Sequence, residues 1–340
     1  MQSKSQAPSI TTGPITAQLL LFFFPILLGT FFQQLYNTVD TIIVGNFVGT
    51  NTALAAVGGA TGQLVNLFVG FFIGLSSGCG VIISQYYGAR DQNAVSKSVH
   101  TALAFSLLSG VVIMVLGLLL TDFSLRAMSL PEEIMPEATA YLRIFFLGMI
   151  PNLFYNMGAA VLRAIGDSKR PLYFLILSCL CNIVLDLIFV AYLRLGVSGA
   201  ALATILSQLA SAVMVLFVLL RTKSGVRLIP SQLRLWAFWL KKMIYVGLPA
   251  GLQSTMYTVS NIIVQVTINS FGTNTIAAVT AYGKMDVIFW MVINAFGIAI
   301  TTFVGQNYGA GKTERAFRGF RAALLLAAIS TLLLSGIIWL

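Results

Sequence analysis

Gln85-Tyr86-Tyr87-Gly88-Ala89-Arg90 recurs late in the chain as Gln306-Asn307-Tyr308-Gly309-Ala310-Gly311. The polar stretch GTNT at 49–52 recurs unchanged at 272–275, and LAAV at 54–57 recurs as IAAV at 276–279. Pro25 and Asn37 likewise match Pro249 and Asn261 in the same order. Apolar sequence of low complexity does not repeat polar segments with a shared order and spacing. The chain therefore contains an internal repeat, which indicates two related halves.

The composition between and around these segments is that of a membrane protein. The 340 residues are 58% hydrophobic and 9% charged, with a mean hydropathy of +0.90. Soluble domains carry about 25% charged residues, and a membrane helix needs roughly 20 apolar residues. Apolar windows predict nine spans, at 15–44, 53–83, 98–120, 139–162, 171–193, 196–220, 243–269, 276–303 and 319–340. The fold class expected is an all-α polytopic membrane protein.

Basic residues lie mainly in alternate loops. Most of the 20 lysines and arginines fall on one side of the predicted topology, and the other side has Arg126 and Arg194 beside an acidic loop. The crowded side comprises Lys4, Arg90, Lys97, Arg163, Lys169, Arg170, Arg221, Lys223, Arg227, Arg234, Lys241, Lys242, Lys312, Arg315, Arg318 and Arg321. Because cytoplasmic loops are rich in lysine and arginine, we expect a multi-pass protein of the inner membrane with a cytoplasmic N-terminus.

The repeat starts at the first predicted span and again at the seventh. An even number of spans separates the copies, so both halves have the same orientation and form a parallel repeat about an axis along the membrane normal. We expect a first lobe at 1–222, a cytoplasmic linker at 223–242 and part of a second lobe at 243–340. Six-helix lobes are expected from the repeat unit, so about three helices of the second lobe would lie outside this sequence.

Two acidic residues within predicted spans each have an amide on the same helix face. An acidic side chain in the middle of a membrane span raises the free energy of insertion by roughly 2.5–3.5 kcal/mol, so its presence indicates a functional or structural role. Asp40 shares a face with Gln33, Tyr36 and Asn37, and Asp186 has Asn182 one turn earlier. Carboxylate and amide oxygens suit a proton or a hard cation such as sodium. The alternatives are an Asp40 hydrated at the membrane surface and an Asn182–Asp186 pair that only joins helices.

Three further residues are candidates for transport. Asp286 in the eighth span is either a cation-attracting charge in the second lobe or an acid satisfied by a neighbour. Pro25 and Pro249 occupy matching places in spans one and seven, where proline kinks a helix. Each kink is either a fixed feature or a bending point.

The sequence lacks the residue patterns typical of metal sites, disulfide-bonded proteins and intramembrane enzymes. Cys79, Cys179 and Cys181 lie in apolar stretches without a zinc or disulfide pattern, and His100 is the single histidine. His-Glu-x-x-His does not occur and histidines do not cluster, so an intramembrane enzyme is disfavoured. The basic residues alternate with apolar spans, which argues against nucleic acid. We expect no enzyme activity, no cofactor and no obligate protein partner.

The sequence resembles the multidrug and toxic-compound extrusion (MATE) family along residues 15–340. The resemblance is carried by Asn37–Thr41 with Val44-Gly45, the two Gln-x-Tyr-Gly-Ala segments, Leu162–Asp167, Gly196–Ala201 and Gly247-Leu248-Pro249. It implies twelve helices in two lobes that open alternately. It also implies export of bulky, often cationic compounds in exchange for protons or sodium.

The resemblance also implies roles for particular residues. Asp40, Tyr36, Asn182 and Asp186 match the family's first-lobe cation site, with sodium expected at Asp40, Asn182 and Asp186, and Thr204 matches a hydroxyl in the sixth span. Gln33, Asn37, Asn261 and Asp286 are the expected cavity residues. One branch of the family has a glutamate about eight residues after the second proline, where this chain has Tyr257. Two alternatives remain: a flippase for lipid-linked sugars, disfavoured by the acidic charges within the spans, and an inactive fragment.

Overall fold

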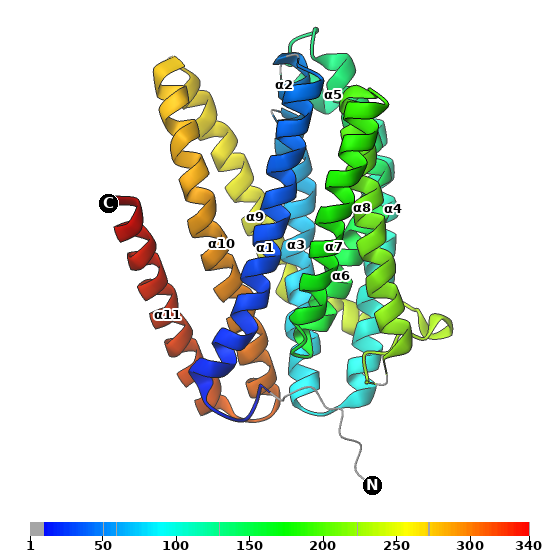
Figure 1. Ribbon diagram of the computed structural model, residues 1–340. Coiled ribbons are helices and arrows are strands. Elements are labelled where there is room, and N and C mark those ends of the chain that lie inside the picture. The colour runs from blue at the N-terminus through cyan, green and yellow to red at the C-terminus, as the bar shows by residue number, and fades with distance from the viewer. Residues whose placement is uncertain are drawn as a thin grey trace.

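A computed structural model describes residues 10–49, 51–58, 60–128, 130–222, 224–270 and 273–339 (Figure 1). Lys4, Thr50, Lys223 and Gly272, named above, lie outside these ranges. Within them the chain is helical, without strands. The helices are α1 (Ile15–Phe47), α2 (Asn51–Gly58), α3 (Ala60–Gly88), α4 (Gln92–Ala127), α5 (Met135–Leu147), α6 (Met149–Ala164), α7 (Lys169–Asp186), the π-helix η1 (Leu187–Tyr192), α8 (Gly196–Arg221), the 3₁₀-helix η2 (Pro230–Gln232), α9 (Ala237–Ser270), α10 (Thr273–Gly309) and α11 (Thr313–Trp339).

Most of the predicted spans are confirmed as long apolar helices. Among the described residues, seven helices are long and apolar enough to cross a membrane, or eight if α5 and α6 form one bent span. The remaining candidate, α9, carries Gln253, Ser254 and Asn261 along its length and is not in that set. The predicted helix at 139–162 was wrong as a continuous rod, because α5 and α6 meet at Gly148 at an angle of 50°.

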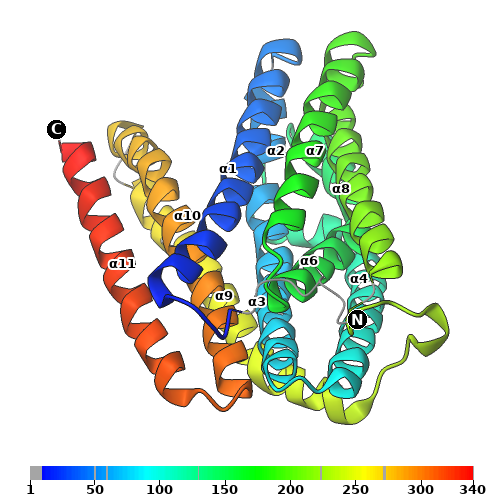
Figure 2. The same ribbon diagram turned by 60° about the horizontal axis from the view of Figure 1, so that its bottom comes forward.

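The turns that carry most of the basic residues lie at one end of the molecule. The segment before α1 and the α3–α4, α6–α7, α8–α9 and α10–α11 connections gather there (Figures 1 and 2). We call this the basic end, and the end with α2 and the start of α5 the opposite end. Toward the opposite end, α9 and α10 diverge from α1 and α3 (Figure 1).

Two apolar clusters hold α3–α8 together. One fills the half nearer the basic end and includes Ile83, Val99, Leu153 and Met157. The other lies nearer the opposite end and includes Leu142, Phe146 and Met149. In a membrane, helices associate mainly through van der Waals contact between such buried side chains.

The two parts of α1 pack on different halves of the molecule. Before Pro25, the side chains of Leu19, Phe22 and Phe23 join α10 and α11 in a third apolar cluster, where Phe23 stacks on Phe296 at 4.0 Å. After it, Gly29 lies against Leu175 of α7. Ile26, directly after Pro25, still belongs to this third cluster, so the change from second-half to first-half partners falls between Ile26 and Gly29, within about one turn after the proline.

Small residues bring α3 and α9 into backbone contact. A β-carbon on Gly74 would lie 2.6 Å from the backbone of Ala250, and one on Gly251 would lie 2.9 Å from the carbonyl oxygen of Phe71. Gly78 and Gly247 are in similarly tight contact. Such close approach is how membrane helices associate through van der Waals contact, and it fixes α9 around Pro249.

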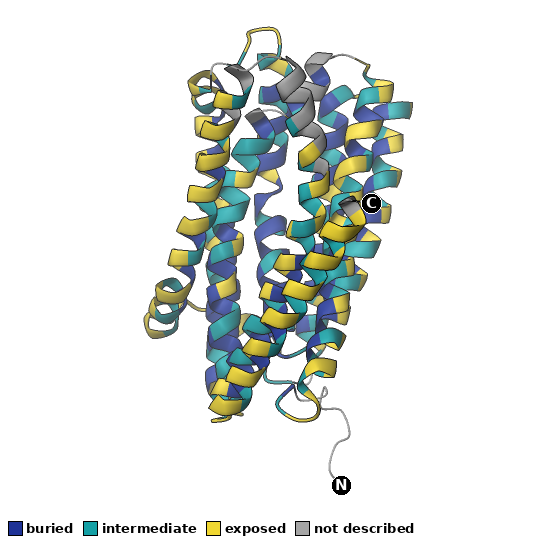
Figure 3. Cartoon of the chain, turned by 90° about the vertical axis from the view of Figure 1, so that its left-hand side faces the viewer, coloured by how far each residue is buried: buried dark blue, intermediate teal, exposed yellow. Residues whose placement is uncertain are grey.

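α11 is the most exposed of the long helices. Only 6% of its apolar window is buried, and its outer face is largely exposed (Figure 3). The exposed residues include Leu325, Leu332 and Leu333. An apolar surface of this extent is expected against lipid or against further helices, not against water.

Candidate functional site

Asp40 lies in the part of α1 nearer the opposite end and is buried, with 6% of its surface exposed. Tyr36 lies one turn earlier on the same helix and is half-buried. Thr41 donates its hydroxyl to the carbonyl oxygen of Asn37, so it is used within α1 itself. The predicted polar stripe therefore leads to a buried carboxylate.

Asp186 ends α7 and is fully buried, as is Asn182 one turn before it. The backbone changes from α-helix to the π-helix η1 directly after Asp186. π-helical segments are rare and occur frequently at functional sites. No sequence pattern had indicated this change.

The two acids lie close enough to interact electrostatically although they come from different helices. Tyr141 of α5 is buried beside both of them and beside Tyr36. Thr204 is buried on α8, the helix that packs against α7 and η1. Asp40, Asp186 and Tyr36 therefore lie within reach of one another's charge, and so does Tyr141, which sequence reasoning had missed.

The carboxylates lack partners within the described part of the chain. Both oxygens of Asp186, both polar atoms of the Asn182 amide and Oδ1 of Asp40 are buried without a hydrogen bond. Unpaired buried charges are strongly unfavourable, and two neighbouring carboxylates also repel each other. A proton or a small cation bound there would remove both penalties. The oxygens of Asp40, Asn182 and Asp186 are of the type that hard cations prefer.

The amides expected in a cavity are exposed. Gln33 and Asn37 on α1 and Asn261 on α9 are all exposed side chains. On long apolar helices, exposed amides are unfavourable against lipid and favour a water-filled space.

Asp286 is held by aromatic neighbours on its own helix. Trp290 donates its indole N–H to Oδ2 at 3.0 Å, and Tyr282 donates its hydroxyl to Oδ1 at 3.5 Å. Tyr257 of α9 meets the Trp290 ring edge to face at 5.2 Å. This acid is thus satisfied by neighbours, and the group as a whole is a carboxylate flanked by aromatic rings.

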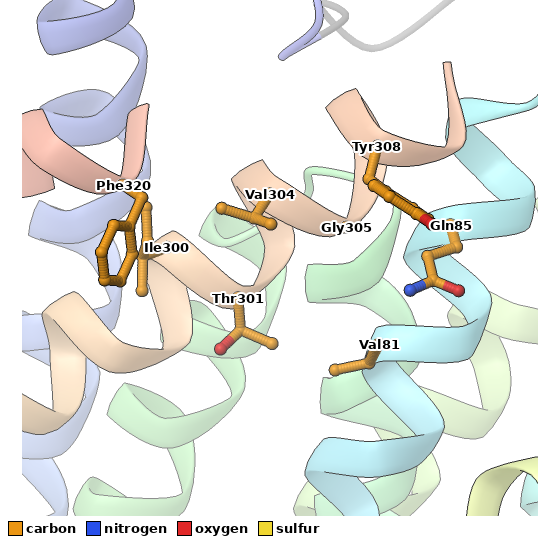
Figure 4. Close-up of a pocket in the computed structure, with 8 residues that line it drawn as sticks. All are labelled: Val81, Gln85, Ile300, Thr301, Val304, Gly305, Tyr308 and Phe320. Atoms are coloured by element: carbon orange, nitrogen blue, oxygen red, sulfur yellow. The ribbon is translucent and has the colours of Figure 1, made fainter. Parts of the chain in front are cut away.

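An apolar pocket of about 430 Å³ lies near the basic end, and neither Asp40 nor Asp186 lines it (Figure 4). It is lined by Val81 and Gln85 of α3, Ile300, Thr301, Val304, Gly305 and Tyr308 of α10, and Phe320 of α11. In the repeat, Ile300 and Val304 correspond to Cys79 and Ile83, which are buried in the cluster that α6 completes. The pocket is therefore the second-half counterpart of a helix-packing surface, and none of its lining residues is acidic or basic.

Comparison with known proteins gives one consistent family. Residues 25–188 and 249–340 match the family model described as MatE. The chain is 32% identical to the probable multidrug resistance protein YpnP of Bacillus subtilis (strain 168), over 91% of this chain and 69% of that protein.

Solved structures agree with the fold. One described as the outward-facing conformation of a multidrug resistance MATE family transporter of the MOP superfamily matches with a TM-score of 0.91 at 26% identity, over 98% of this chain and 74% of that one. A MATE structure in the bent conformation matches with a TM-score of 0.85 at 28% identity, over 93% of this chain and 70% of that chain.

Proposed function

This chain belongs to the MatE family, and we propose that it exports bulky organic compounds, often cations, in exchange for protons or sodium. The proposal places the coupling ion at Asp40 and Asp186, with Asn182, Tyr36 and Thr204 around it and Tyr141 added. The observation that carries the proposal is the pair of buried carboxylates that lack hydrogen-bond partners among the described residues.

The physical coupling follows from charge burial. When the pair is ionised, the site favours water and an open cavity, because a buried charge is costly. When a proton or sodium neutralises it, the surrounding helices can close over the site. The ion thereby stabilises one state over the other by the difference between its two binding affinities.

Alternating access is proposed between a first lobe at 1–222 and a second lobe beginning at 243, joined by the linker at 223–242. Backbone contacts join α3 and α10 at the basic end, and α9 and α10 diverge from α1 and α3 toward the opposite end (Figure 1). Because Asn37 and Asn261 are exposed in the diverging parts of α1 and α9, these features support a state open at the opposite end. Pro25 suits a bending point, since α1 changes its packing partners within about one turn after it. Pro249 suits a fixed kink, because α9 is held against α3 on both sides of it.

The compound is proposed to contact Gln33, Asn37 and Asn261 between the lobes, with Asp286 and its aromatic neighbours on the second lobe. A carboxylate beside Trp and Tyr rings attracts organic cations by charge and by cation–π interaction. The positive-inside rule supports an inner-membrane protein with a cytoplasmic basic end and N-terminus.

Accumulation of a fluorescent organic cation in expressing cells tests the proposal. Wild type should lower accumulation, and Asp40→Asn should not, at equal protein level in the membrane. Asp122→Asn is the matched control, because Asp122 is exposed and pairs with the exposed Arg143. Full export by Asp40→Asn would refute the assigned role of this carboxylate.

A further inference from the structure

The short segment Ile10–Gly13 precedes α1 and lies between the two halves, since the side chain of Ile10 also belongs to the third apolar cluster with residues of α10 and α11. Ile10 is buried, with 5% of its surface exposed. It packs on Gly166 in the α6–α7 turn, where a β-carbon would lie 3.2 Å from its Cδ1 atom. Gly166 has a φ of +92°, which a residue with a side chain rarely adopts. The turn therefore offers Ile10 a flat backbone surface that only glycine provides.

The second half holds the same segment through its main chain. Lys312, just before α11, donates to the carbonyl oxygen of Thr11 at 2.9 Å. Arg315 donates to the carbonyl oxygens of Ile10 at 3.4 Å and Thr12 at 3.2 Å, and its guanidinium lies over the Phe303 ring at 5.4 Å. Hydrogen bonds from charged donors are stronger than neutral ones.

The segment lies where the two halves meet at the basic end. Next to it, Gln306 of α10 donates its side-chain N–H to the carbonyl oxygen of Ala164 at 2.7 Å. Gly305 lies against Ser84 of α3. Ile10–Gly13 thus joins the α6–α7 turn of one half to the start of α11 in the other.

We propose that Ile10–Gly13 is a clasp that holds the basic end closed. The proposal rests on the alternating access proposed above. When the halves separate at this end, Ile10 cannot stay on Gly166 while its carbonyl stays on Arg315, so one set of contacts breaks. The clasp therefore stabilises the closed state, and weakening it shifts the population toward the open one.

A single cysteine at the seam measures this population. Ser84 is fully buried against Gly305, so Ser84→Cys in the purified full chain should react slowly with a maleimide. The same chain with Ser84 unchanged gives the background from Cys79, Cys179 and Cys181. Two clasp variants are compared in this background: Ile10→Ala, and Lys312→Gln combined with Arg315→Gln. Arg318→Gln is the control, because Arg318 is exposed and pairs with Glu314 on its own helix.

Both clasp variants should raise the labelling rate of Ser84→Cys roughly fivefold, the change expected from losing a few weak contacts of the closed state, and Arg318→Gln should leave it unchanged. Unchanged labelling in both clasp variants, with melting temperatures near that of the parent, would overturn the proposal. If the double variant melts early, Ile10→Ala decides, since it removes only an apolar side chain. Labelling needs no substrate or ion, so the test of the clasp is separate from the test of export. If the clasp variants change the labelling rate but the chain exports nothing, the clasp proposal stands and the proposed function fails.

Discussion

Gly88 of α3 lies against the backbone of Gln306 on α10 so closely that a β-carbon on Gly88 would collide with it. The repeat reverses the pair: Gly309 of α10 lies in the same way against Gln85 of α3. The two Gln-x-x-Gly segments that reveal the repeat in the sequence therefore contact each other across the seam. The reciprocal contact is what a pseudo-two-fold axis between the halves requires.

Replacing either glycine should open this contact. Gly88→Ala or Gly309→Ala forces α3 and α10 apart at the basic end, and overpacking of this kind costs about 1–3 kcal/mol. We expect a lower melting temperature in detergent for both variants. Gly297→Ala on α10 is the control, because a β-carbon there meets no atom within 4 Å. Equal melting temperatures for Gly88→Ala and Gly297→Ala would show that the seam is not tightly packed.

The two buried acids should act as one unit. Asp40→Asn and Asp186→Asn each remove a charge that the other carboxylate senses, so the double variant should lose about as much export as either single variant. Coupled residues are non-additive in a double-mutant cycle, whereas independent ones add within about 0.5 kcal/mol. Initial export rates of all four proteins give the cycle. Losses that simply multiply would separate the two acids into independent roles.

The aromatic group around Asp286 should discriminate between charged and neutral compounds. Asp286→Asn keeps an acceptor for the Trp290 indole but removes the charge, so we expect the KM for an organic cation to rise about tenfold, corresponding to roughly 1.4 kcal/mol. The KM for an uncharged compound of similar size should change little. Competition between one cation and one neutral compound for transport measures the ratio. An equal effect on both would leave Asp286 with a structural role.

Lys242 of α9 contacts aromatic side chains of α3 and of its own helix. Its ammonium donates to the Tyr86 hydroxyl at 2.7 Å and lies 4.4 Å from the centre of the Phe238 ring. Lys242→Met should therefore lower the melting temperature, by the equivalent of about 1–2 kcal/mol. Lys241→Met changes an exposed neighbour and should have no effect. Identical behaviour of the two variants would contradict a specific contact at Lys242.

The sequence predicted those site residues whose presence in a membrane helix is energetically unfavourable. Asp40 and Asp186 stand out because an acid is expensive in an apolar helix, and their amide neighbours follow from helical spacing. Tyr141 could not be found in this way, because a tyrosine near a helix start is ordinary and only the packing of α5 places it beside the acids. The bend at Gly148 and the π-helix after Asp186 likewise depend on tertiary contacts.

The same limit applies to contacts between the halves. The repeat predicted that α3 and α10 are equivalent, but not that their Gln-x-x-Gly segments meet. His100 is a further case, since its Nε2 accepts from the backbone of Ile229 at 2.9 Å and fixes the linker to α4. A lone histidine gives no sequence signal for a partner that lies so far along the chain.

The central claim is that the Asp40–Asp186 site couples an ion to export, and reconstituted vesicles test it most directly. An organic cation is followed after a proton gradient or a sodium gradient is imposed, for wild type and for Asp40→Asn. Wild type should transport the cation against its concentration difference with at least one of the two gradients, and Asp40→Asn should transport with neither. Equal gradient-driven transport by both proteins would contradict the account.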